Sequence, residues 1–207
     1  MWKGPYAKLP AVLIGFAIGL FVTKAGAMEP LRLTPQTAVV VPDGKLDRHT
    51  QSAAATLRDW LRKATASEGG FNIISQGDIG DAPAGPVLAV GSTRWTDPHE
   101  LAGLWRDGYV LRRKGNVIVI AGGRPSGTFH GACGFLDRFC GVRFYMPTEL
   151  FTSLPGERQV AVREVDLVMD PFVKSCYMSG INYDDPRDSP WVRRVGGWRR
   201  LGGTHQH

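Results

Sequence analysis

Residues 108–147 read GYVLRRKGNVIVIAGGRPSGTFHGACGFLDRFCGVRFYMP. The stretch predicts two paired strands, a glycine-rich helix and a further strand, in that order. Residues 109–111 and 117–120 are apolar runs separated by Lys-Gly-Asn at 114–116, a pattern typical of a β-hairpin. Pro125 suits the first turn of the helix that follows. This unit therefore predicts a sheet with a helix beside it.

The helix expected at 125–140 carries two stripes of residues. The apolar stripe consists of Phe129, Ala132, Cys133, Leu136 and Cys140. Gly127, Gly131 and Gly134 recur at i, i+4 and i+7 and form the second stripe. An interior glycine costs up to about 1 kcal/mol relative to alanine, so several on one face predict a helix lying unusually close to the sheet. Gly141 suits the C-terminal end of the helix.

The chain before residue 108 alternates strand-like and helix-like segments. The expected strands lie at 38–41, 71–74 and 87–90, and the expected helices at 50–65 and 99–105. Thr50 or Ser52 is the expected N-cap of the first helix. Together with the hairpin, this order predicts an α/β (α+β) two-layer sandwich, in which helices pack on a mixed sheet.

The chain after residue 147 predicts a second unit. A further strand is expected at 142–145, one or two strands at 159–168, an apolar element at 171–179 and a helix at 191–201. Arginines on that last helix alternate with Trp191 and Trp198, so we expect both tryptophans to pack on a neighbour. The predicted division is 1–27, 28–168 and 169–207, and 207 residues suffice for one full domain and part of another.

The first 27 residues have the pattern of a secretory signal peptide. Lys3 and Lys8 give a positive segment before an apolar run at 9–22, and Ala25-Gly26-Ala27 is a small-x-small cleavage site. The apolar run is shorter than the roughly 20 residues of a membrane-spanning helix. We expect cleavage after Ala27 and a secreted or periplasmic protein. The alternative is an uncleaved anchor, which would be the chain's sole contact with a membrane.

The basic charge is concentrated at the two ends of the chain. The formal net charge of the chain is +6. Three positive charges come from the lysines of the first 27 residues, and residues 187–207 hold five arginines against one aspartate. The remainder is close to neutral, which argues against a nucleic-acid partner.

Three cysteines, Cys133, Cys140 and Cys176, leave at least one thiol without a partner in the chain. Cys133 and Cys140 would lie about 10.5 Å apart along a helix axis, beyond the ~7 Å Cα separation of a disulfide. Both are expected to face the core. Cysteine spacing typical of a zinc site is missing from the sequence, and we predict neither metal nor cofactor.

Several polar groups could form functional sites, but the sequence favours a role in packing, in a turn or at the surface for each. The glycines at 122–127 could cradle an anion, but close packing explains them better. Arg112, Arg113 and Lys114 are expected in a solvated turn, and His130 at the surface or in packing. Asp184, Asp185 and Asp188 are expected to form a turn. A Ser/His/Asp arrangement is not indicated by the sequence.

The hairpin, the Gly-Gly pair, the glycine helix and the aromatic strand ending at Pro147 resemble the non-catalytic N-terminal domain of bacterial alpha-glucuronidases and beta-hexosaminidases. The resemblance covers residues 37–165. The nearest pattern is that of secreted bacterial proteins that couple this domain to a glycosidase barrel. It implies an accessory domain of an exported glycoside hydrolase, with carbohydrate as a ligand and a barrel domain as packing partner.

The resemblance also implies that residues 169–207 begin a TIM-type barrel that is truncated here. Lys174, His205 and His207 would then lie on the substrate side, and the catalytic carboxylates would lie beyond the chain, leaving it inactive alone. Two alternatives stay open. One is a stand-alone carbohydrate-binding or interaction module, and the other is a nucleotide-binding enzyme that uses residues 122–127.

Overall fold

The computed structural model of the chain describes residues 28–156, 159–172, 176–177, 182, 184–185, 188–195 and 198–199. Its centre is a six-stranded mixed sheet in the order β10-β5-β6-β4-β2-β3. The strands are β2 (Ala38–Val41), β3 (Ile73–Ser75), β4 (Val87–Val90), β5 (Tyr109–Lys114), β6 (Val117–Gly122) and β10 (Asp166–Met169). Four strands, β3, β2, β4 and β6, run parallel, and β5 and β10 each pair antiparallel with their inner neighbour.

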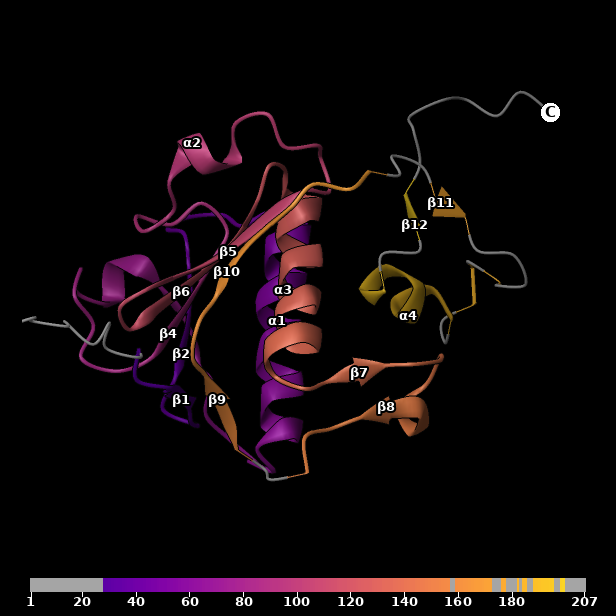
Figure 1. Cartoon of the computed structure of the whole chain (residues 1–207), viewed down its shortest axis with the longest axis horizontal. Coiled ribbons are helices and arrows are strands. Elements are labelled where there is room, and N and C mark those ends of the chain that lie inside the picture. Colours follow the sequence, from indigo (N-terminus) through magenta and orange to yellow (C-terminus); the bar gives the residue numbers. More distant parts are fainter. Residues whose placement is uncertain are drawn as a thin grey trace, which may run out of the picture.

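Two long helices, α1 (Arg48–Ala64) and α3 (Pro125–Phe139), lie side by side on one face of this sheet (Figure 1). Alternate strand residues face them. The strand residues buried with the helices are Val39, Val41, Leu88, Val90, Leu111, Ile118 and Ile120. The predicted mixed sheet with helices packed on it is therefore confirmed.

The opposite face of the sheet is also buried. Val40, Val87, Ala89, Val117, Val119 and Ala121 form a second apolar cluster there. Three further residues pack against it: Ile79, which directly follows η1 (Gln76–Asp78), Trp95 from the loop after β4, and Leu101 from the short helix α2 (Pro98–Leu101). Burial on both faces explains why β2, β4 and β6 are nearly continuous apolar runs.

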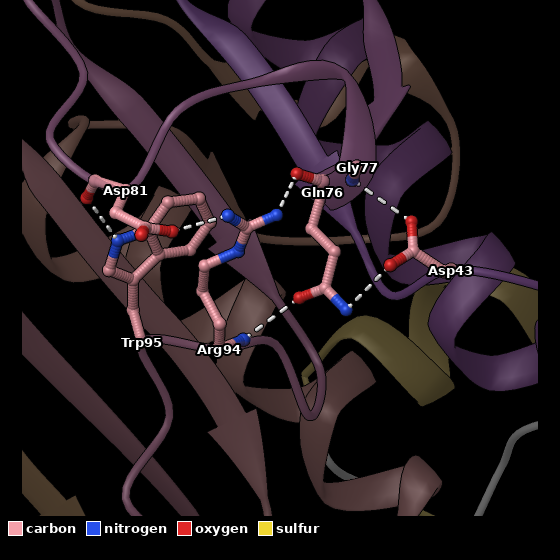
Figure 2. Close-up of polar contacts among 6 residues, drawn as sticks. All are labelled: Asp43, Gln76, Gly77, Asp81, Arg94 and Trp95. Carbon is pink, nitrogen blue, oxygen red and sulfur yellow. Dashed lines mark hydrogen bonds and ion pairs between the residues drawn. The ribbon is translucent and has the colours of Figure 1, made fainter.

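The covering loops on that face are joined by hydrogen bonds that begin at Asp43, just after β2. Its carboxylate accepts from the Ser75 hydroxyl. It also accepts from the Gly77 amide (2.9 Å) and the Gln76 side chain (3.0 Å), and Figure 2 shows these two bonds. The hydrogen bond from Ser75 and the two others hold the pKa of Asp43 below its usual value.

Arg94 and Trp95 extend the same network to the loop before β4 (Figure 2). The Arg94 guanidinium pairs with the Asp81 carboxylate and donates to the Gln76 carbonyl, while the Trp95 indole N–H donates to the Asp81 carbonyl at 2.9 Å. Three loops are thereby fixed over the second apolar cluster, against which the short helix α2 also packs through Leu101.

The N-terminus of α1 differs from the prediction, because Asp47 is the N-cap rather than Thr50 or Ser52. One Asp47 carboxylate oxygen accepts from the amides of His49 (2.8 Å) and Thr50 (2.9 Å). The other oxygen accepts from the Thr50 hydroxyl at 2.6 Å. Burial raises the pKa of Asp47, but these hydrogen bonds outweigh it and keep the pKa below its ordinary value. Aspartate ranks among the strongest caps, so the signal was present in the sequence.

The glycine stripe of α3 lies against β5, as predicted. A Cβ on Gly127 would be 2.2 Å from the Gly108 carbonyl oxygen, and one on Gly134 would be 2.5 Å from the Tyr109 hydroxyl. A Cβ on Gly131 would be 3.2 Å from the Tyr109 Cβ. Pro125 is in the first turn of α3, and Gly141 follows the helix with a φ of 71°. The hairpin of β5 and β6 is confirmed as well.

The segments after α3 form small pairs beside the main sheet and helices. β7 (Arg143–Phe144) pairs with β8 (Thr152–Ser153) next to η2 (Glu149–Phe151). β9 (Val160–Val162) pairs with the first strand, β1 (Leu31–Leu33), so residues 159–168 form two strands.

The C-terminal segment contains α4 (Asp188–Arg194) and the antiparallel pair β11 (Cys176–Tyr177) and β12 (Trp198–Arg199). The helix predicted through residue 201 is wrong at its end, because Trp198 lies in a strand. Two glycines, at 196 and 197, follow Val195 and disfavour helix continuation. Consecutive strands of a TIM-type barrel are parallel, so this antiparallel pair does not confirm the start of a barrel. The division at residues 168 and 169 stays a prediction.

Trp191 anchors α4 to the rest of the fold. Its side chain is 8% exposed, and its indole N–H donates to the Phe144 carbonyl at 3.1 Å. Next to it, Arg194 lies over the rings of Trp60 and Phe144, at 5.4 Å and 5.6 Å from their centroids. Burial lowers the pKa of Arg194. The expected packing of a tryptophan from this helix on a neighbour is confirmed for Trp191.

The signal peptide predicted for residues 1–27 lies outside the residues that the structure describes. Among the helices that are described, none has the length and apolarity of a membrane span.

Candidate functional site: a basic pocket at two helix N-termini

A pocket of about 340 Å³ lies where the N-terminal ends of α1 and α3 meet, next to α4 and the loop before β5. Its described lining consists of Arg48, His49, Arg106, Asp107, Ser126, Phe129, His130 and Arg193. Cavities of roughly 300–1,000 Å³ are typical of small-molecule sites. Four separate segments contribute to this one pocket.

Asp107 is the buried acid of the pocket, with 4% of its surface exposed. Its carboxylate lies 3.6 Å from Arg106 Nε and 4.0 Å from His130 Nε2. A buried carboxylate is stable only when it is paired and hydrogen-bonded. Asp107 therefore helps to hold Arg106 and His130 in place in the pocket wall.

The loop that carries Arg106 and Asp107 is fixed by polar contacts at several points. The Ser126 hydroxyl donates to the Arg106 carbonyl at 3.0 Å, which joins the loop to α3. The Trp105 amide donates to the Asp170 carboxylate at 2.9 Å, which joins it to the end of β10. The pocket wall is thus part of the rigid fold.

The charge of the pocket is strongly positive. Among the described lining residues, three guanidinium groups, those of Arg48, Arg106 and Arg193, accompany one carboxylate, that of Asp107. Arg106 Nε is buried and lacks a hydrogen-bond acceptor in the structure, and leaving a buried donor unsatisfied costs about 1–3 kcal/mol. The pocket can therefore accept negative charge.

The position of His130 agrees only in part with the sequence prediction. It is half-buried in packing, as expected, but it also lies in a pocket beside an aspartate and a serine. The Ser126 hydroxyl donates to a main-chain carbonyl, so the serine proton is not directed to a base. The sequence placed Ser126 and His130 four residues apart on one helix. It carried no signal that Asp107 lies in the same pocket.

The prediction of a solvated turn was wrong for Arg112 and Arg113, which are half-buried in β5, whereas Lys114 is exposed at the end of β5 beside the turn. Arg112 pairs with Glu100 at 3.2 Å and with Asp166, its direct cross-strand neighbour on β10. Arg113 donates to main-chain carbonyls, among them that of Gly115 at 3.0 Å, and Lys114 donates to the Trp95 carbonyl at 2.9 Å. These side chains fasten neighbouring segments because β5 is longer than the apolar pattern indicated.

The glycine run at 122–127 serves packing, as favoured from the sequence. A Cβ on Gly122 would lie 2.2 Å from the Thr128 amide nitrogen. The Gly122 amide already donates to the Thr128 hydroxyl (3.1 Å), and the Gly123 amide donates to the Gly108 carbonyl (3.0 Å). Amides committed to the protein in this way are not available to cradle a phosphate.

Cys133 and Cys140 are free thiols buried in the core, as predicted. Burial raises the pKa of the Cys133 thiol to about 12, and burial raises that of Cys140 as well. Neither thiol is suited to act as a nucleophile at neutral pH.

We expect both thiols to resist dithionitrobenzoate at pH 8 in the native chain, measured in a Cys176→Ser background. Local opening that costs about 3 kcal/mol slows the reaction roughly 100-fold, and both thiols should react at once in guanidinium. Because the thiol pKa is higher in the folded than in the unfolded chain, the neutral thiol contributes stability below the ordinary thiol pKa. This contribution is lost as the pH rises through the folded pKa. The unfolding midpoint should therefore fall between pH 9 and about 12, and less so in Cys133→Ala. Rapid labelling at pH 8 would contradict the burial.

Other predicted site residues lie apart from this pocket. Lys174, His205 and His207 are outside the residues that the structure describes. Asp184 and Asp185 form the expected turn, since their amides donate to the side-chain and main-chain oxygens of Asn182, each at 3.1 Å. Within the described part of the chain, groups of three or more potential metal ligands are absent.

Comparison with known proteins does not establish a family. Neither a protein-family model nor a curated protein matches the chain. Among solved structures, it is similar to the GH20 beta-N-acetylhexosaminidase from Streptomyces coelicolor A3(2), with 18% identity, a TM-score of 0.43, and coverage of 72% of this chain and 26% of that one. The N-acetyl-beta-hexosaminidase from Streptomyces plicatus gives 19% identity, a TM-score of 0.42, and coverage of 72% and 25%.

The GH20 exo beta-N-acetylglucosaminidase from Vibrio harveyi is similar over 71% of this chain and 18% of its own, with 14% identity and a TM-score of 0.41. The chain thus spans about a quarter or less of these enzymes. They are hexosaminidases, one of the two enzyme groups that the sequence resembles. At such identities and TM-scores the likeness does not assign an activity, and the link to alpha-glucuronidases stays a prediction.

Proposed function

We propose that this chain is the accessory, non-catalytic domain of an exported glycoside hydrolase that acts on a polysaccharide or glycan. The proposal begins from the sequence resemblance of residues 37–165. The hairpin, the closely packed glycine helix and the aromatic strand β7 are the elements that carry this resemblance.

The observation that carries the non-catalytic assignment is the chemistry of the basic pocket. Glycoside hydrolysis generally uses two carboxyl groups about 5–10 Å apart. Among the described residues that line this pocket, the single carboxylate is Asp107, which is buried and ion-paired with Arg106. A carboxylate held in this way favours a structural role over acid/base work.

A second candidate function is a carbohydrate-binding module that acts without a barrel. The pocket itself favours this reading, since its size and mixed lining of Phe129 and polar side chains suit a small polar ligand. Both functions predict the same behaviour toward chromogenic substrates and differ in binding.

We expect the purified 207-residue chain to release no nitrophenol above the blank from a panel of nitrophenyl glycosides that includes glucuronides and N-acetylhexosaminides. Turnover above the blank that is abolished in Asp107→Asn would contradict the accessory role. Isothermal titration with uronic-acid and hexosamine oligomers separates the two candidates, because a binding module gives saturable heat without a partner domain.

A further inference from the structure

We propose that the basic pocket between α1 and α3 binds a sugar-sized ligand that carries an oxyanion, that is, a carboxylate, sulfate or phosphate group. The inference rests on the proposed function only in taking the ligand to be a saccharide. It adds the ligand's charge and the residues that recognise it.

The arrangement of charges is the first argument. Arg48 comes from the start of α1, Arg106 from the loop before β5, and Arg193 from α4, yet all three line one cavity. An anion in this cavity would be attracted by the guanidinium charges that line it. The planar guanidinium fork also matches carboxylate, sulfate and phosphate oxygens geometrically.

The second argument is an unmet hydrogen-bonding capacity. Arg106 Nε is buried without an acceptor, and its nearest carboxylate oxygen, on Asp107, is 3.6 Å away. That distance is longer than a normal hydrogen bond. The Asp107 carboxylate orients the guanidinium, and 40% of the Arg106 side chain stays exposed, so the group is held in place and open to a ligand oxygen.

The third argument is the helix end that borders the pocket. The 15-residue helix α3 begins at Pro125, and its N-cap, Arg124, provides no side-chain acceptor for the first amides. The positive end of a helix dipole adds to the attraction for an anion. This contribution supports the arginines and does not replace them.

The size and the apolar wall point to a ligand larger than a bare ion. The cavity holds about 340 Å³, and Phe129 contributes a partly buried aromatic ring to its lining. A lining that combines polar groups with an aromatic ring suits a compact molecule with a charged and a less polar part. A charged monosaccharide unit has these properties.

The test is isothermal titration of the 207-residue chain at low ionic strength with four matched probes: galactose, galacturonate, galactose 6-sulfate and galactose 6-phosphate. Inorganic sulfate and phosphate are titrated separately. We expect at least one anionic sugar to bind tenfold or more tightly than galactose and than either inorganic ion. The three oxyanion arms identify which group the arginines recognise.

Variants connect the binding to the pocket. Arg106→Gln and the more exposed Arg48→Gln should each weaken the anionic sugar at least tenfold. Arg58→Gln is the matched control, because Arg58 is also on α1 but pairs with Asp59 outside the pocket. Circular dichroism and thermal midpoints establish that each variant is folded. If Arg106→Gln does not fold, the binding of Arg48→Gln alone decides the test.

Three results would overturn the inference: equal affinity for galactose and the anionic sugars, equal affinity for the inorganic ions, or full binding in both pocket variants. Absence of binding by every probe would overturn it as well. None of these results affects the accessory role, which the nitrophenyl glycoside assay decides independently.

Discussion

Replacing Gly127 by alanine is expected to destabilise the fold by about 3 kcal/mol or more, at the upper end of the cost of overpacking a core. The new Cβ would be 2.2 Å from the Gly108 carbonyl oxygen and 3.1 Å from the Arg106 carbonyl oxygen. Both are main-chain atoms of the loop before β5, so the helix or this loop has to move. The thermal midpoint should fall by roughly 6–12 °C for a domain of this size.

Two glycine variants provide the comparison. Gly85→Ala has open space around the new Cβ, so its stability should stay within about 0.5 kcal/mol of the parent chain. Gly134→Ala meets the end of a side chain, the Tyr109 hydroxyl at 2.5 Å, rather than main-chain atoms. It should therefore cost less than Gly127→Ala. Equal midpoints for Gly127→Ala and Gly85→Ala would contradict the close approach of α3 to the loop before β5.

Replacing Trp191 by alanine should detach α4 from α3, because removal of a large buried aromatic side chain costs about 3–5 kcal/mol. The seven-residue helix is too short to persist alone in water. Detachment would remove Arg193 from the basic pocket and Arg194 from the ring of Trp60. Trypsin cleavage at Arg193 and Arg194 should accelerate at least tenfold, measured by mass spectrometry of timed digests.

The matched variant is Trp191→Phe, which keeps an aromatic ring but loses the hydrogen bond to the Phe144 carbonyl. A lost hydrogen bond costs about 1 kcal/mol, so cleavage in this variant should be close to that of the parent chain. The six-stranded sheet should survive both changes, since Trp191 lies on α4 and is not part of the sheet. Unchanged cleavage in Trp191→Ala would indicate that α4 does not depend on Trp191.

Local sequence signals predicted the elements that local physics controls. The Gly-Asn turn between two apolar runs specified the β5–β6 hairpin, and Pro125 and Gly141 marked the ends of α3. The glycine stripe even indicated the distance between helix and sheet, because glycine in a helix is unfavourable unless space forbids a side chain. These features depend on neighbours within a few positions.

The candidate site could not be predicted in the same way. Arg48, Asp107, His130 and Arg193 are far apart in sequence, and each alone resembles an ordinary surface or packing residue. Arg112 was misread for the same reason: its partners, Glu100 and Asp166, are 12 and 54 positions away. Long-range pairing of charges leaves no periodic pattern in the chain.

The sequence by itself therefore determined the class of fold, the hairpin, the glycine helix and the burial of both cysteines. Each of these follows from hydrophobic periodicity, turn chemistry or the steric demands of glycine. The tertiary structure decided where the arginines meet, which acid is buried among them, and that Trp191 fastens α4 beside them. A pocket is defined by distances across the chain, and those exist only after the sheet and its two helices have packed.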